Sequence, residues 1–344
     1  MNILVTGGAG FIGSNFINYL LSTYENTIVN VDLLTYAGNL ENLNGSSNNP
    51  QYHFIKGDIT DRTLMDEIFH RFEVDVVINF AAESHVDRSI EDPSIFVKTN
   101  VTGTNVLLQS AKEYWMINQP DESCVKYKDG VKFIQISTDE VYGDLKDGGY
   151  FTEKTNLAPN SPYSASKASG DLMVRAYYET YNLPAIVTRC SNNYGPYQFP
   201  EKLIPLLIHR ANQDQKLPIY GDGNQVRDWL YVEDHCTAID AVLHKGVAGE
   251  VYNIGGNNEK TNIEIAKRLL HLLGKSEELI EFVKDRLGHD RRYAIDHTKI
   301  TQELGWSPSY TFEEGIEKTV TWYLENQDWL DRIYSDTYAV DPVQ

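Results

Sequence analysis

Cysteine is scarce in this sequence, and long apolar runs are absent. The 344 residues include only three cysteines, Cys124, Cys190 and Cys236. Because three is an odd number and the spacing fits no metal-ligand pattern, we expect free thiols in a reducing cytoplasm, no disulfide framework and no bound metal. No apolar run approaches the roughly 20 residues that span a bilayer. The chain enters Ile3-Leu4-Val5 without a basic segment before it, so we expect no signal peptide and no membrane association.

Positive charge is also in short supply. Thirty Lys and Arg residues face 49 Asp and Glu residues, which gives a formal net charge of −19. A nucleic-acid-binding protein needs a basic face, so we expect no nucleic-acid partner. A small anionic substrate is compatible with this charge only if Arg and Lys gather locally against the overall field. The C-terminal half contains such residues.

Short apolar runs alternate with helix-like segments over the first half of the chain. The hydrophobic fraction of 41% and the mean hydropathy of −0.40 are typical of a globular protein. Strands are predicted at 3–5, 27–31, 52–55, 74–78, 133–136 and 185–188, and helices near 11–23, 61–71, 93–114 and 163–181. Asp61 and either Pro93 or Ser94 are expected helix starts. This alternation predicts an α/β fold with a Rossmann-type, doubly wound parallel sheet.

The rhythm changes after about residue 190. Strands shorten, Pro and Gly increase, and helices are predicted near 202–213, 233–245, 261–273 and 312–325. We therefore expect a first domain at 1–190, to which part of 228–256 returns, and a smaller, interleaved C-terminal α/β domain at 191–344. The polar stretch 116–130 is interpreted as a surface insertion, with a disordered loop as the alternative.

The first predicted strand runs directly into a glycine-rich turn. The segment Val5-Thr6-Gly7-Gly8-Ala9-Gly10-Phe11-Ile12-Gly13 fits both GxxGxxG and GxGxxG. Such a turn lets the backbone approach a pyrophosphate and aims a helix N-terminus at its charge. A glycine pattern alone is common, but here a strand precedes it and a helix follows. The turn therefore predicts a dinucleotide site.

Acidic and polar residues lie at or just after the ends of the next predicted strands. Asp32 lies 19 residues after Gly13, where a carboxylate accepts hydrogen bonds from ribose hydroxyls and repels a 2′-phosphate, so NAD is favoured over NADP. Taken alone, Asp32 is an ordinary turn residue. The loops Asp58-Ile59 and Ala81-Ala82-Glu83 are expected to face the same cofactor, because ligands bind at the carboxyl ends of parallel strands.

Tyr163 and Lys167 lie one helical turn apart in Tyr163-Ser164-Ala165-Ser166-Lys167. An ammonium near a phenol favours the phenolate, so we expect Lys167 to lower the pKa of Tyr163. A phenolate takes a hydroxyl proton while hydride leaves for NAD. By itself this pattern often marks a solvated helix, but the glycine-rich turn favours the catalytic interpretation.

Two adjacent acids follow the strand at 133–136. In Ser137-Thr138-Asp139-Glu140, the carboxylates repel each other, so one is expected to hold a proton and act as an acid while the other acts as a base. The alternative is a turn with two solvated acids. Together with Tyr163 and Lys167, the pair suggests oxidation followed by elimination.

These motifs resemble those of the extended short-chain dehydrogenase/reductases that act on nucleotide sugars, and within them the dTDP-glucose 4,6-dehydratase family. The resemblance extends from the first strand to about residue 310. Besides the motifs above, it rests on the segments Ala81-Ala82-Glu83-Ser84-His85-Val86-Asp87, Arg189-Cys190-Ser191-Asn192-Asn193-Tyr194-Gly195-Pro196 and Arg227-Asp228-Trp229-Leu230-Tyr231-Val232. Related sugar epimerases carry the tyrosine and lysine but usually lack the acid pair.

The resemblance implies a role for each catalytic residue. Tyr163 takes the proton of the sugar 4-hydroxyl, Glu140 removes the proton on carbon 5, and Asp139 protonates the departing 6-hydroxyl. Thr138 polarises the 4-oxygen, and Lys167 holds the nicotinamide ribose. The hydride returns to carbon 6, so NAD is expected to stay tightly bound and to be recycled in each turnover.

The resemblance also implies the binding residues. Further cofactor contacts are expected at Phe11, Ile12, Leu33, Thr35, Thr99 and Asn193. The cations Lys202, Arg227 and Arg286, with Asn192, are expected at the diphosphate, and Ser84 and Thr138 at the sugar. The residues expected near the base are Pro218, Ile219, Tyr220 and Asn262. The remaining expected substrate residues are Leu203, Asp285 and His289. Leu287 stands where the family usually has Pro, a departure within the Arg286 loop.

Several alternatives remain beside a dTDP-glucose 4,6-dehydratase with a small nucleotide-sugar substrate. A nucleotide-sugar 4-epimerase would leave the acid pair idle. A dehydratase for a UDP- or GDP-sugar would differ only at the base pocket. A non-catalytic NAD-binding regulator would typically lack Tyr163 or Lys167. The family also implies a cytoplasmic homodimer, formed through the helices near 97–114 and 163–181, and a product that commonly leads to rhamnose.

Overall fold

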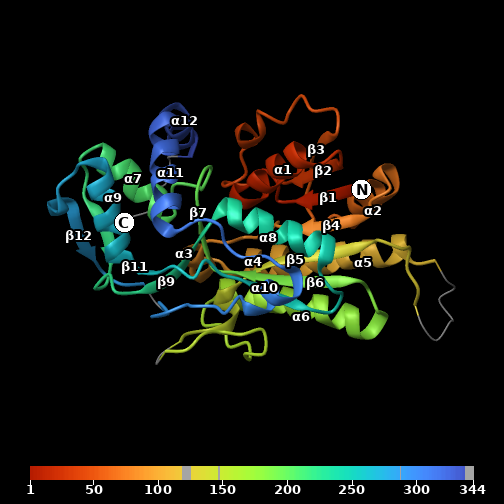
Figure 1. The fold of residues 1–344 in the computed structure, drawn as a ribbon. Coiled ribbons are helices and arrows are strands. Elements are labelled where there is room, and N and C mark those ends of the chain that lie inside the picture. The colour runs from red at the N-terminus through yellow and green to blue at the C-terminus, as the bar shows by residue number, and fades with distance from the viewer. Residues whose placement is uncertain (118–124, 146–147, 287, 338–344) are drawn as a thin grey trace.

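One parallel sheet forms the centre of the molecule. The computed structural model describes residues 1–117, 125–145, 148–286 and 288–337. Seven strands lie in the order β10-β6-β5-β4-β1-β2-β3, and all neighbouring strands are parallel. Figure 1 shows this sheet with helices on both sides. The strands are β1 Asn2–Thr6, β2 Thr27–Asp32, β3 Tyr52–Lys56, β4 Val76–Asn79, β5 Lys132–Thr138, β6 Ala185–Cys190 and β10 Val251–Ile254.

Two apolar cores, one on each face, bury this sheet. Ile3 and Val5 point into one core, and Leu4 points into the other, because successive side chains of a strand alternate between faces. Strands that are buried on both faces need continuous apolar sequence, which β1 and β4 have. The predicted doubly wound α/β sheet is confirmed.

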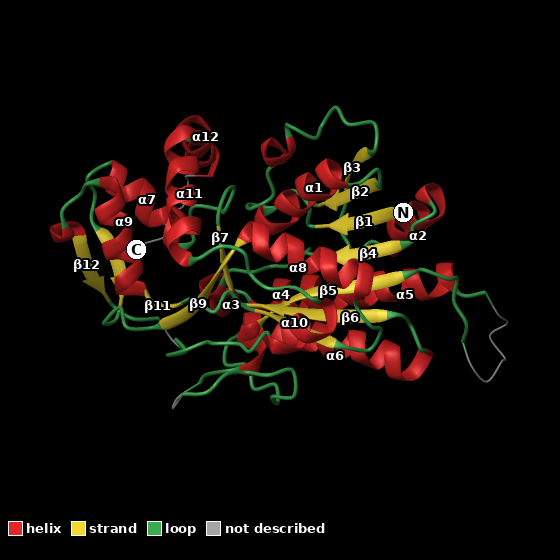
Figure 2. Cartoon of the chain, viewed as in Figure 1, coloured by secondary structure: helices red, strands yellow, loops and turns green. Residues whose placement is uncertain are grey.

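Helices cover the two faces in separate layers (Figure 2). The first core contains side chains of α1 Phe11–Thr23, α8 Val232–Lys245 and α10 Thr298–Leu304. The second contains side chains of α2 Arg62–Phe72, α5 Thr104–Trp115 and α6 Pro162–Tyr181. Two of these helices begin at clear caps. Asp61 accepts from Leu64 N, and Ser161 and Ser164 form a capping box in front of α6.

The helix predicted at 93–114 is not a single α-helix. It is preceded by α3 Val86–Glu91 and divided into α4 Pro93–Phe96, the π-helical segment Val97–Gly103 and α5. Asp92 caps α4, and Pro93 lies in its first turn. A β-carbon on Gly103 would lie 2.4 Å from the Ile59 side chain, so the wide turn lies close against the loop after β3. π-helical turns often occur at functional sites, and this one carries Thr99.

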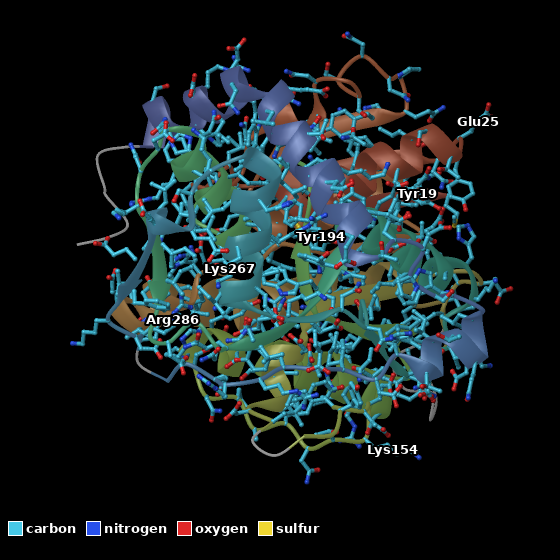
Figure 3. The ribbon with its side chains drawn as sticks, turned by 60° about the vertical axis from the view of Figure 1, so that its left-hand side comes forward. Tyr19, Glu25, Lys154, Tyr194, Lys267 and Arg286 are labelled. Carbon is cyan, nitrogen blue, oxygen red and sulfur yellow. The ribbon has the colours of Figure 1, made fainter. Side chains whose placement is uncertain are left out.

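The second region contains shorter strands and its own core. A three-stranded sheet has the order β11-β9-β7, and β12 pairs with β8 in parallel. Tyr194, at the centre of this core and near the middle of the molecule in Figure 3, is fully buried against Trp229 and Phe312. The elements are β7 Asn192–Tyr194, α7 Leu203–Asn212, β8 Leu217–Tyr220, β9 Val226–Tyr231, β11 Glu259–Thr261, α9 Asn262–Leu273, β12 Ile280–Val283, α11 Phe312–Glu325 and α12 Gln327–Thr337.

The two regions are interleaved along the chain. After β6 the chain enters the second region, returns to the large sheet with α8 and β10, leaves again, and comes back once more with α10. The C-terminal helix α12 then reaches the first region, where Trp329 Nε1 donates to Asn42 Oδ1 at 3.0 Å. Asn42 lies in the short 3₁₀ helix Leu40–Leu43 and donates to the carbonyl of Ala9 in the glycine-rich turn.

Two backbone hydrogen bonds join the start of the polar stretch after α5 to its end. Ile117 N donates to Lys126 O, and Lys128 N donates to Trp115 O. Residues 118–124, with Cys124, lie outside the described part of the chain. The other two cysteines are buried and free. No helix within the described residues has the length and apolar character of a membrane span.

Candidate active site

The glycine-rich turn forms one end of the main cavity. Gly7 has a φ of 70°, and a β-carbon there would lie 2.6 Å from Ala81 N. A β-carbon on Gly13 would lie 2.4 Å from Gly7 O. Gly10 caps α1 without any side chain, so the first N–H groups of that helix remain available to an anion. The turn is therefore a backbone cradle of the kind that a pyrophosphate requires.

Asp32 is held at the rim of this cradle by two backbone donors. Ala9 N donates to Oδ2 at 2.9 Å, and Leu34 N donates to Oδ1 at 2.8 Å. Burial raises the pKa of Asp32, and these two hydrogen bonds oppose the shift. Each carboxylate oxygen keeps a lone pair that can accept from a ribose hydroxyl.

All the cofactor residues expected from the sequence line one cavity of about 400 Å³. The cavity follows the carboxyl ends of the parallel strands, where α/β folds bind their ligands. Its lining includes Gly7, Gly10, Phe11, Ile12, Gly13, Asp32, Leu33, Thr35, Asp58, Ile59, Ala81, Ala82, Glu83, Thr99, Tyr163, Lys167 and Asn193. The residues present thus fit a dinucleotide.

The acid pair lies at the inner end of the same cavity. Asp139 and Glu140 begin a one-turn 3₁₀ helix, Asp139–Tyr142, which follows β5 directly. Thr138 Oγ1 accepts from Glu140 N at 3.2 Å and donates to Asp139 Oδ1 at 3.3 Å. The turn therefore aims both acids into the cavity from a single strand end.

Burial and charge affect the two acids differently. Burial raises the pKa of Asp139 well above its usual value, and Glu140 and Asp228 raise it further. Burial also raises the pKa of Glu140, but there the cations Arg227, Lys202 and Arg286 oppose the shift. The pKa is raised further at Asp139 than at Glu140, so Asp139 is the member of the pair that more readily holds a proton, and Glu140 is the better candidate for the base.

Tyr163 and Lys167 face the acids from the first turns of α6, and both line the cavity. Lys167 Nζ donates to the carbonyl of Ile136 at 2.8 Å. Burial raises the pKa of Tyr163 well above its usual value, and Glu140, Cys190 and Asp139 raise it further. The expectation that Lys167 lowers the pKa of Tyr163 is therefore wrong for the polypeptide itself, because burial and the carboxylates dominate.

The expected substrate residues fall into two groups. Ser84, Thr138, Asn192 and Lys202 line the main cavity, and Lys202 Nζ donates to Ser84 O at 3.2 Å. The others lie outside that lining, in the second region. They are Leu203, Pro218, Ile219, Tyr220, Arg227, Asn262, Asp285, Arg286 and His289.

Several members of the second group contact one another. The Arg286 guanidinium lies 4.9 Å from the centre of the Tyr220 ring, and His289 Nδ1 lies 2.6 Å from Asp285 Oδ1. Gln225 Nε2 donates to Asp285, and the backbone carbonyl of Gln225 accepts from Asn262 N. Leu287, between Arg286 and Gly288, lies outside the described residues.

Sequence reasoning missed several contacts between the first and the second region. Arg286 pairs with Asp87 at 3.3 Å across the two regions. Glu201 accepts from Tyr36 Oη at 3.0 Å and lies 3.6 Å from His85 Nε2. The motif Ala81–Asp87 was a signal for Asp87 and His85, and the segment Glu201-Lys202-Leu203 resembles a substrate segment of the family. The pairing of Glu201 with Tyr36 has no local signal, because only the fold brings these two residues together.

Comparison with known proteins decides the family. The model for GDP-mannose 4,6 dehydratase matches residues 4–319. The chain is 53% identical to the dTDP-glucose 4,6-dehydratase of Xanthomonas campestris, with 99% of this chain and 98% of that protein covered. The chain belongs to the dTDP-glucose 4,6-dehydratase family.

Solved members of this family have the same fold. The Bacillus anthracis dTDP-glucose 4,6-dehydratase, solved in complex with NAD, is 54% identical, with a TM-score of 0.87 over 97% of this chain and 99% of that one. The Streptomyces venezuelae enzyme, also solved with NAD, is 47% identical, with a TM-score of 0.90 over 97% and 100% of the two chains. NAD is therefore the cofactor of this dehydratase family member.

The cradle yields a first prediction. We expect Gly13→Ala to weaken NAD binding, because the new methyl group must displace the Gly7 carbonyl. Overpacking of this kind typically costs about 1–3 kcal/mol, which corresponds to a roughly five- to hundred-fold higher Kd in calorimetric titration with NAD. Gly45→Ala is the matched control, since a β-carbon there meets nothing within 4 Å. An unchanged Kd for Gly13→Ala would contradict the cradle.

The acid pair yields a second prediction, for stability. Because the folded-state pKa of Asp139 is raised from 3.8, the folded protein binds more protons than the unfolded chain above that pH. Stability is therefore lost as pH rises. Asp139→Asn removes this titration and should raise the free energy of unfolding at neutral pH by about 1 kcal/mol or more.

Urea unfolding at several pH values tests this prediction. The gap between Asp139→Asn and the wild type should widen as pH rises from about 4. Glu25→Gln, which removes an exposed acid labelled in Figure 3, is the charge-matched control and should show no widening. A gap that stays constant with pH would argue against a raised pKa at Asp139.

Proposed function

We propose that this chain converts dTDP-glucose to dTDP-4-keto-6-deoxyglucose and water. The observation that carries the proposal is the placement of Asp139 and Glu140 in one cavity with Tyr163, Lys167 and a dinucleotide cradle. Tyrosine and lysine at a nicotinamide serve oxidation alone. The buried pair of acids adds what an elimination needs, a base and a proton donor.

The cofactor is held by the residues of the cradle and the strand ends. The first turn of α1 and Gly7 bind the pyrophosphate, Asp32 accepts from the adenosine ribose, and Lys167 holds the nicotinamide ribose. Bound there, NAD would supply the acceptor for the hydride of carbon 4 and, once reduced, the donor of hydride to carbon 6. We propose that it is retained between turnovers, since the reaction consumes no net reductant.

The chain's own groups move the protons. Tyr163 accepts the proton of the 4-hydroxyl, while Thr138 polarises the 4-oxygen. The resulting ketone acidifies the proton on carbon 5, which Glu140 removes. Asp139, whose pKa is raised by burial and by its acidic neighbours, gives its proton to the departing 6-hydroxyl. Carbon 5 then takes a proton back from Glu140 when hydride adds at carbon 6, and exchange of that proton with solvent would place deuterium on carbon 5. Each transfer uses a group within the same cavity.

The nucleotide lies in the second region under this proposal. Arg227, Lys202 and Arg286 all act on the charge of Glu140, so their positive field reaches the catalytic end of the cavity. With Asn192, they bind the diphosphate, and Ser84 contacts the sugar. The base lies against Pro218, Ile219, Tyr220 and Asn262. Residues 1–190 and part of 228–256 would then serve NAD, and 191–344 mainly the nucleotide sugar.

A product assay tests the function. Incubation with dTDP-glucose in deuterated water, without added reductant, should give a 4-keto-6-deoxy sugar with deuterium on carbon 5. UDP- and GDP-sugars run in parallel identify the base preference. Turnover without deuterium at carbon 5 would exclude the elimination, and gluco–galacto interconversion without loss of water would identify an epimerase. The double variant Asp139→Asn with Glu140→Gln should form no product, whereas an epimerase should survive it.

We further propose a cytoplasmic homodimer whose product feeds dTDP-rhamnose formation. Exposed apolar side chains support a contact surface at the start of the helix pair. Leu172 of α6 is 53% exposed and Val97 is 54% exposed. Two chains joined through α5 and α6 would cover such side chains.

Sedimentation measurements test the dimer. The wild type should sediment at about twice the monomer mass of 39.1 kDa, and Leu172→Arg should shift it toward the monomer, because a charge is then buried without a partner. Val247→Arg, at a residue of similar exposure in the loop after α8, should leave the mass unchanged. A monomeric wild type would refute the proposal.

A further inference from the structure

Tyr142 anchors the short helix that carries the acid pair. It is the last residue of the 3₁₀ helix Asp139–Tyr142, and only 3% of it is exposed. Its hydroxyl donates to Asn253 Oδ1 on β10 at 2.8 Å and accepts from Arg189 Nη1 on β6 at 3.0 Å. Its ring stacks on Phe151 with centroids 5.0 Å apart. The 3₁₀ helix is therefore anchored by side chains of two strands, β6 and β10.

Arg189 extends this contact to the helix that carries Tyr163. Its Nε donates to Asp171 Oδ2 at 2.9 Å, and its guanidinium also lies 4.9 Å from the centre of the Tyr142 ring. Asp171 lies on α6, one turn after Lys167. A buried chain of side chains, Tyr142–Arg189–Asp171, thus joins the acid-bearing turn to α6 through β6.

The burial of Arg189 and Asp171 restricts these side chains to one arrangement. Arg189 is 6% exposed and Asp171 is 2% exposed. A buried ion pair of this kind adds little stability over a well-packed apolar alternative, but removal of one partner leaves an uncompensated charge. In the observed arrangement Arg189 bonds one Asp171 oxygen and the Tyr142 hydroxyl at the same time, so a shift of either partner would break a buried hydrogen bond. The network therefore restricts how the acid-bearing turn and α6 can shift relative to each other.

We propose that Tyr142, Arg189 and Asp171 are positioning residues that fix Asp139 and Glu140 relative to Tyr163 and Lys167. This inference rests on the proposed dehydratase function. Proton transfer during oxidation at carbon 4 uses Tyr163 on α6, with Thr138 at the end of β5 at the 4-oxygen, whereas proton transfer during elimination uses the acids on the 3₁₀ turn. Loss of the anchor at Tyr142 should therefore slow elimination more than oxidation.

Tyr142→Phe is the sharpest variant, because it keeps the ring stack on Phe151 and removes only the hydroxyl. A displacement of the reacting groups by about 1 Å can cost roughly a hundredfold in rate, so we expect overall turnover to fall by about ten- to a hundred-fold. In single-turnover absorbance measurements with dTDP-glucose, the reduced cofactor should accumulate transiently, since oxidation outruns elimination. Deuterium uptake at carbon 5 should slow by the same factor as product formation.

Tyr252→Phe is the matched control. Tyr252 is fully buried on β10, next to Asn253 but on the opposite face of the strand, and its hydroxyl accepts from Val247 N outside the site. We expect a similar loss of stability with wild-type turnover. Arg189→Lys is a second variant, which keeps a positive charge for Asp171 and removes the hydrogen bond to the Tyr142 hydroxyl. We expect the reduced cofactor to accumulate in this variant as well.

The outcomes separate this inference from the proposed function. Wild-type turnover in Tyr142→Phe, or an equal slowing of oxidation and elimination, would overturn the positioning role. If the wild type makes no product from dTDP-glucose, the proposed function fails. Amide hydrogen exchange at 139–142 then still decides the inference. Faster exchange in Tyr142→Phe than in Tyr252→Phe supports it, and equal exchange overturns it.

Discussion

Parallel pairing of the central strands is the constraint on which the site depends. In a parallel sheet all carboxyl ends face one edge, so residues far apart in sequence meet there. Gly7 follows β1, Asp32 ends β2, Ala81 follows β4, and Asp139 follows β5, and all four line one cavity. The register of β5 with β6 also places Thr138 opposite Cys190. Cofactor and acids therefore share one edge because the strands share one direction.

The second region supplies positive charge to that edge of the sheet. The chain carries an excess of negative charge, and the cavity itself contains several acids. Lys202, Arg227 and Arg286 come from the second region, and their field favours the ionised form of Glu140. The ion pair of Arg286 with Asp87 links this cationic group to the first turn of α3. Arg286 thus both joins the second region to the first and favours the ionised form of the base.

The sequence predicted what local patterns encode. Alternating apolar runs predicted the doubly wound sheet. The glycine spacing predicted the tight turn after β1, where a β-carbon on Gly7 or Gly13 would clash with neighbouring backbone atoms. The π-helical turn at Val97–Gly103 was missed because helical periodicity does not distinguish it from an α-helix. The pairing of Glu201 with Tyr36 was missed because it depends on how the two regions meet. Interactions over long sequence separations leave no local signal.

The state of Asp139 affects more than the elimination. Burial and two carboxylates raise the pKa of Tyr163, and Lys167 is engaged with the Ile136 carbonyl. A neutral Asp139 removes one of those negative charges, so it favours the phenolate form of Tyr163, which accepts the 4-hydroxyl proton before the proton of Asp139 is needed at the 6-hydroxyl. The acid-bearing turn must therefore hold Asp139 buried from the first chemical step. The side chains that anchor this turn then matter for the order of the reaction as well as for its geometry.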